Sequence, residues 1–102
     1  MRPEISMNRV GWFLPYSIAG VHEALQQLRA MVDGIDGRSL EDWDRRSLRY
    51  QLERAARWVT YVVRCIRESE PACAELDALE IEQRDFVALV KRVVLTLERS
   101  GS

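Results

Sequence analysis

The sequence predicts an all-α protein, an antiparallel up-down-up bundle of three helices. Apolar residues recur at alternating spacings of three and four along most of the chain, which places them on single helical faces. Gly34 and Pro71 separate three such segments, because neither residue favours continuation of a helix. The predicted connections are short, and short connections make consecutive helices antiparallel neighbours.

The composition fits one globular domain. The chain has 102 residues, of which 47% are apolar and 30% are charged. Its net charge of −1 argues against binding to nucleic acid or membranes through bulk charge. No apolar run approaches the 18 residues of a membrane span. Glu4 precedes the N-terminal apolar run of residues 10–21, Pro15 lies within it and the run is short, so we expect no signal peptide and a cytoplasmic location.

Residues 1–14 are expected to form an extended aromatic arm that precedes the bundle. They contain Pro3 and Gly11 and show no regular apolar period. Trp12 and Phe13 are the large side chains of this arm. The helical bundle domain is expected to span residues 15–100.

The first helix is predicted over residues 16–33. Pro15 and Ser17 favour a helix start, and Gly34 favours its end. One apolar stripe follows the 3-4 spacing and consists of Ile18, Val21, Leu25, Leu28 and Val32. This helix is therefore amphipathic, with one buried side.

The second helix is predicted over residues 39–68, with Ser39 as N-cap and a second start conceivable at Asp44. One apolar stripe consists of Leu48, Leu52, Ala55, Val59, Val62 and Ile66. A second stripe lies beside it and consists of Trp43, Tyr50, Trp58, Tyr61 and Cys65. A surface helix of a small domain needs one apolar stripe, so the second stripe requires a further covering element.

The third helix is predicted over residues 71–99, with Pro71 in its first turn. Its main stripe consists of Ala72, Leu76, Leu79, Phe86, Val90, Val93 and Leu97. The segment Glu80–Gln83 adds no residue to this stripe, which leaves a break there open. Cys65 and Cys73 flank the predicted turn, and either two reduced thiols or a disulfide is compatible with that placement.

The first helix is too short to cover the whole central helix. The second stripe must therefore be covered by the aromatic arm, by another subunit or by both. We expect self-association, with a homodimer as the simplest form. The interface would then complete a four-helix or larger bundle.

Charge is divided between the second and third helices. Residues 45–67 contain seven arginines and Glu53, a balance of +6, and residues 68–85 contain seven acids and Arg84, a balance of −6. In an antiparallel hairpin, residues 54–67 would run beside the acids of residues 75–85. We expect these charges to neutralise each other and to help fix the register of the hairpin.

At the other end of the hairpin this neutralisation is expected to fail. The residues predicted to meet there are Arg45, Arg46, Arg49, Lys91 and Arg92. Arginine beside an aromatic side chain can hold phosphate or stack on a base. This end is the predicted contact for an anion or nucleic acid.

The residues that support catalysis are sparse. His22 is the single histidine, and no spacing matches a zinc site, a bundle metal site or a phosphate-binding loop. Nothing in the sequence orients a nucleophile with a base. We therefore expect no enzyme activity, metal, cofactor or small-molecule substrate.

The sequence favours a non-catalytic helical protein-interaction module that self-associates and binds an unidentified protein. Small adaptors, chaperones, regulators and phage- or plasmid-type accessory proteins share this architecture. The expected interface residues are Trp12, Phe13, Trp43, Tyr50, Trp58 and Tyr61. The alternative is a small accessory protein that binds nucleic acid through the basic end of the bundle.

Overall fold

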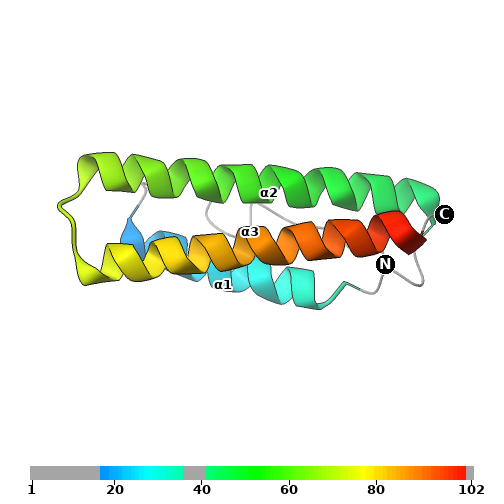
Figure 1. Ribbon diagram of the computed structural model, residues 1–102, viewed down its shortest axis with the longest axis horizontal. Coiled ribbons are helices and arrows are strands. Elements are labelled where there is room, and N and C mark those ends of the chain that lie inside the picture. The colour runs from blue at the N-terminus through cyan, green and yellow to red at the C-terminus, as the bar shows by residue number, and fades with distance from the viewer. Residues whose placement is uncertain (1–16, 36–40, 101–102) are drawn as a thin grey trace.

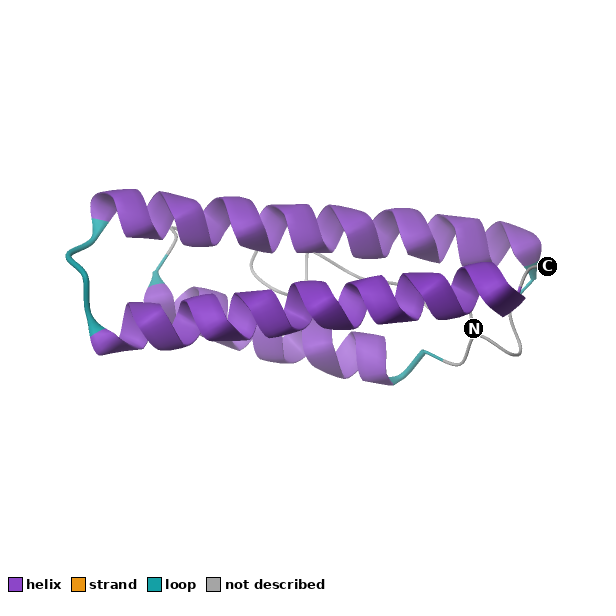
Figure 2. Ribbon diagram, viewed as in Figure 1, coloured by secondary structure: helices purple, strands orange, loops and turns teal. Residues whose placement is uncertain are grey.

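The computed structural model describes residues 17–35 and 41–100, apart from the side chains of Asp42 and Ser100. It contains three helices, α1 (Ile18–Asp33), α2 (Asp42–Ser69) and α3 (Ala74–Ser100), and no strand among the described residues (Figures 1 and 2). The predicted all-α, three-helix architecture is confirmed. The predicted arm lies outside the described residues.

Helix α1 begins at the predicted cap. The Gly20 amide donates a hydrogen bond of 3.0 Å to Ser17 Oγ, which satisfies one of the free donors of the first turn. At the other end the Gly34 amide donates to the Ala30 carbonyl oxygen at 3.2 Å. Gly34 has φ −80°, so the helix ends without the left-handed conformation that often makes glycine necessary there.

Helix α2 starts later than predicted and is continuous. Its N-cap is Glu41, which makes no side-chain capping bond, so the expectation of Ser39 as N-cap is wrong. The helix runs through Asp44 without a second start. It ends at Ser69, where the Glu70 amide donates to the Ile66 carbonyl oxygen at 2.8 Å.

Residues 70–73 form the link between α2 and α3. Pro71 lies in this link and not in the first turn of α3 as predicted. Helix α3 passes through Glu80–Gln83 without a break. Glu80 and Gln83 contact Arg67 and Thr60 of α2, so polar contacts with the neighbouring helix take the place of apolar ones in this segment.

The core lies along the line where the three helices meet. Among the described residues α2 contributes eight buried apolar side chains, and α1 and α3 contribute five each. No polar or charged residue of the described part is buried. Helix α1 packs more extensively against α3 than against α2. These features make α2 the main supplier of the core.

Helix α1 covers only part of the hairpin formed by α2 and α3. It has 16 residues, whereas α2 has 28, and at 1.5 Å per residue their lengths are about 24 and 42 Å. Figure 1 shows the hairpin continuing beyond the C-terminal end of α1. Across the described ranges, no helix is long and apolar enough to span a bilayer.

Candidate functional site

Three aromatic side chains project from the outer side of α2. Trp43 is 64% exposed, Tyr50 is 60% exposed and Tyr61 is 57% exposed. Trp43 and Tyr61 are 18 residues apart, or about five helical turns, and Tyr50 lies two turns from Trp43, so all three share one side of the helix. Exposed large aromatic groups of this kind are common where a protein contacts another molecule.

Trp58 was predicted to share that surface, but it lies in the core. Its exposed fraction is 9%, and it belongs to the same buried cluster as Ala55 and Val62. Those two residues lie three before and four after it in the sequence, so Trp58 turns towards the inside of the bundle. The two remaining predicted interface residues, Trp12 and Phe13, lie outside the described residues.

Three arginines accompany the exposed aromatic residues. Arg46, Arg57 and Arg64 are exposed and have no hydrogen bond or ion pair with described residues. The spacing of seven residues continues from Tyr50 through Arg57 to Arg64, which keeps them on one side of α2. We call the surface formed by Trp43, Arg46, Tyr50, Arg57, Tyr61 and Arg64 the aromatic-arginine face.

Arg67, by contrast, is fully engaged with α3. Its Nε and Nη2 atoms lie 2.7 and 2.6 Å from the two carboxylate oxygens of Glu80, and Nη2 also lies 3.1 Å from Asp77 Oδ1. The hydrogen bond from Arg67 lowers the pKa of the Glu80 carboxyl, and the same bond raises the pKa of Arg67. The predicted neutralisation therefore occurs near the turn, although it does not extend to Arg57 and Arg64.

Replacing Arg67 with glutamine should raise the Glu80 pKa towards its ordinary value of 4.5. Because the lowered pKa belongs to the folded state, the stabilisation is complete above pH 4.5 and disappears as the pH falls through the lowered value. Carbon-13 NMR titration of the Glu80 carboxyl measures the shift. Arg64→Gln, one turn away on the same helix, is the control and should leave the Glu80 pKa unchanged.

The predicted basic end does not form as expected. Arg49 Nη1 lies 2.9 Å from Glu98 Oε1, and Arg49 Nε lies 3.2 Å from Glu53 Oε1. Because α2 and α3 are antiparallel, this pair places Lys91, seven residues before Glu98, at the level of Ala56, seven residues after Arg49. The contact between Gln83 and Thr60 places Lys91 nearer the level of Leu52, so Lys91 lies about 5–10 Å along the bundle from the level of Arg49.

The position of the link explains this difference. Because α3 begins at Ala74 and not at residue 71, each residue of α3 lies nearer the turn than the prediction placed it. Arg92 moves with Lys91, away from Arg45 and Arg46. Lys91 and Arg92 thus lie nearer the turn than Arg45, Arg46 and Arg49, and Arg49 is paired with acids.

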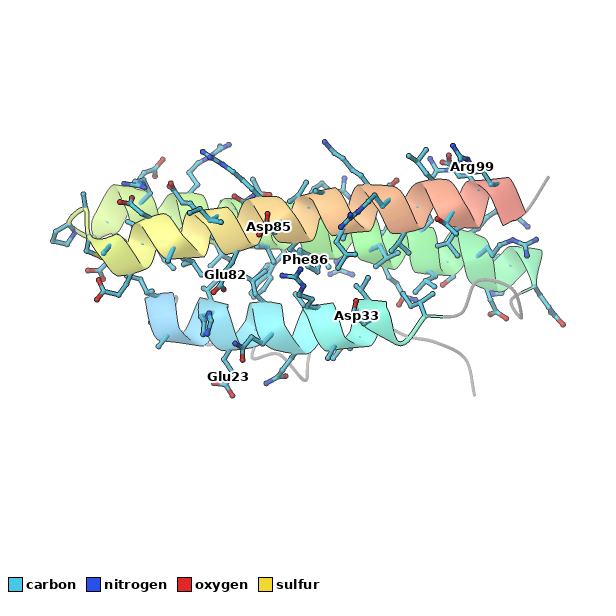
Figure 3. The ribbon with its side chains drawn as sticks, turned by 60° about the horizontal axis from the view of Figure 1, so that its bottom comes forward. Glu23, Asp33, Glu82, Asp85, Phe86 and Arg99 are labelled. Atoms are coloured by element: carbon cyan, nitrogen blue, oxygen red, sulfur yellow. The ribbon has the colours of Figure 1, made fainter. Side chains whose placement is uncertain are left out.

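A second surface feature lies between α1 and α3 and has no counterpart in the sequence prediction. It is a cavity of about 480 Å³ lined by Ile18, Ala19, His22, Glu75, Ala78, Leu79 and Glu82, which we call the α1–α3 groove. In Figure 3, Glu82 lies between these two helices, whereas Glu23 points away from the bundle. The sequence feature that could have indicated this groove is the small residue Ala78 between Glu75 and Glu82, which are seven residues apart.

His22 links the two walls of this groove. Its Nδ1 lies 2.7 Å from Glu82 Oε2, and its Nε2 lies 3.0 Å from Gln26 Nε2. A neutral ring protonated on Nδ1 satisfies both contacts, because Nδ1–H donates to the carboxylate and Nε2 accepts from the amide. The histidine thus has a structural role in holding α1 against α3.

The thiols and acids assemble no further site in the described part of the chain. Cys65 and Cys73 are both half-buried free thiols, so the bridged alternative is not observed. Within residues 17–35 and 41–100, no three His, Cys, Asp or Glu side chains are grouped so that they could hold a metal ion.

The molecule therefore presents two distinct surfaces, the aromatic-arginine face of α2 and the α1–α3 groove. Each is assembled from residues that the helices hold in fixed positions. Comparisons with protein-family models, with curated proteins and with solved structures found no match to the chain.

Proposed function

We propose that this protein is a non-catalytic helical interaction module that binds proteins, including a second copy of itself, through the aromatic-arginine face. The observation that carries the proposal is the exposure of Trp43, Tyr50 and Tyr61 along one side of α2. Tryptophan, tyrosine and arginine are the residues most enriched at the energetic centres of protein interfaces.

The size of the face supports this role. A specific interface buries about 800 Å² on each partner. A fully buried aromatic side chain contributes about 150–250 Å², and the apolar stem of each arginine adds to the contact area. Three aromatic and three arginine side chains on one helix can therefore supply a large part of such an interface.

Self-association through this face should appear in light scattering over a range of protein concentrations. We expect the mass to rise above the monomer value of 11.9 kDa as concentration increases. The double variant Trp43→Ser/Tyr50→Ser should weaken association about tenfold or more, because it removes two exposed aromatic contacts.

Ile81→Ser provides the control for that experiment. Ile81 is 59% exposed but lies on α3, away from the aromatic-arginine face. It should associate as the unaltered protein does, and circular dichroism should show that all variants remain helical. A mass of 11.9 kDa at every concentration would refute self-association.

The alternative is a small accessory protein that binds nucleic acid. The observation in its favour is the group of exposed arginines beside tyrosine on α2, since arginine holds phosphate and aromatic rings stack on bases. Binding of labelled DNA or RNA that falls steeply with salt and is lost in Arg57→Glu/Arg64→Glu would favour this alternative. Lys91→Glu/Arg92→Glu is the charge-matched control on α3.

A further inference from the structure

We infer that the aromatic-arginine face of one copy docks into the α1–α3 groove of a second copy, with Tyr61 entering the groove between Glu75 and Glu82. This inference rests on the proposed function, because it requires self-association through the α2 face. Beyond the proposed function, the inference names the surface that binds the α2 face and the residues that meet at this contact.

The two surfaces match in apolar character. The apolar residues that line the groove include Ile18, Ala78 and Leu79. The volume of about 480 Å³ accommodates an aromatic ring with the stems of neighbouring side chains. Tyr61 offers such a ring, with 57% of its surface exposed.

The two surfaces also match in charge and spacing. Glu75 and Glu82 line the groove and are seven residues apart on α3. Arg57 and Arg64 lie on either side of Tyr61 and are seven residues apart on α2. Seven helical residues span about 10.5 Å, so both arginines can meet both carboxylates at the same time. Glu82 uses Oε2 for His22, which leaves Oε1 for an arginine.

A symmetric contact between two α2 faces is less favourable. It would bring the like charges of Arg46, Arg57 and Arg64 from both copies together. Like charges placed across an interface repel each other, whereas the groove offers carboxylates to the arginines. The occupant of the groove is therefore the α2 face of another copy, and the contact joins two different surfaces.

The arrangement of the helices determines which kind of oligomer this contact forms. The buried side of α2 faces α1 and α3, so the aromatic-arginine face lies on the side of α2 away from those two helices. Each copy then keeps one unused surface after pairing. A contact between two different surfaces continues into a ring or an open filament and does not stop at a symmetric dimer.

Ala78→Arg tests this arrangement, because it fills the groove and places a cation where Arg57 and Arg64 of the next copy would arrive. We expect association to weaken by about tenfold or more. Ala88→Arg is the matched control, since Ala88 is also exposed on α3 but does not line the groove. Glu75→Lys is a second groove variant that leaves the His22 contact intact.

Mixing two defective variants gives the decisive measurement. Ala78→Arg keeps an intact α2 face, and Arg57→Glu/Arg64→Glu keeps an intact groove. At a protein concentration above the dissociation constant of the unaltered protein but below that of each variant, each variant should be monomeric alone, and an equimolar mixture should form a 1:1 pair that grows no further. This result requires two different surfaces, because a symmetric interface gives no such rescue.

The outcomes separate this inference from the proposed function. If Ala78→Arg and Glu75→Lys associate as the unaltered protein does while Trp43→Ser/Tyr50→Ser does not, the groove assignment is wrong and the proposed function stands. A mixture that stays monomeric also overturns the groove assignment. An unaltered protein that is monomeric throughout removes both the inference and the proposed self-association.

Discussion

Replacing Phe86 with alanine should lower the free energy of unfolding by about 3–5 kcal/mol. Phe86 is 1% exposed and is the bulkiest of the fully buried side chains in the described core. It lies between α3 and α1 (Figure 3) and lines the same pocket as Leu25 of α1. Its removal takes away buried apolar area and leaves a cavity at the position where α1 is held.

Urea unfolding followed by circular dichroism measures this change. Ile81→Ala is the control on the same helix, because Ile81 is 59% exposed and its truncation should change stability by about 0.5 kcal/mol or less. An equal effect of the two substitutions would contradict the assignment of Phe86 to the core. Both proteins should be measured at low concentration, so that self-association adds no stability.

Replacing Trp58 with alanine should also cost about 3–5 kcal/mol, even in the monomer. Trp58 is 9% exposed and packs within the core cluster, so its loss acts on folding and not on an exposed surface. The same substitution at Trp43, which is 64% exposed, should change monomer stability by about 0.5 kcal/mol or less.

These two tryptophans form a matched pair on one helix. The substitution that lowers stability should leave self-association intact, and the substitution that weakens self-association should leave stability unchanged. Trp43→Ala should weaken self-association while folding is retained. Trp58→Ala should lower the urea midpoint, and it should affect association only when the protein is partly unfolded. A Trp58 variant with unchanged stability would show that this side chain does not belong to the core.

The helices and most of the core follow from the apolar spacing of the sequence. The stripe from Leu48 to Ile66 is buried as predicted, because packing of one apolar side against neighbouring helices is what stabilises an amphipathic helix. Ser17 caps α1 as predicted, since its side-chain oxygen and the Gly20 amide are close in sequence. Local signals of this kind need no knowledge of the partner helices.

The candidate site depended on information that no local pattern contains. The register of α3 against α2 depends on how residues 70–73 are folded, and a later helix start moved Lys91 away from Arg49. The positions of α1 and α3 around α2 decide that Trp58 is buried while Tyr61 is exposed. The groove arises from two helices that are distant in the sequence, so only the assembled bundle defines it.

The unequal distribution of burial constrains how this sequence can vary. Helix α2 supplies eight of the buried apolar residues and also carries the six residues of the aromatic-arginine face. Half of its 28 positions are therefore committed either to packing or to the exposed surface. A substitution in α2 can disturb either the core or the aromatic-arginine face. A substitution on the outer side of α3 should have little effect on folding. Substitutions should consequently be more frequent on the outer side of α3 than at these committed positions of α2.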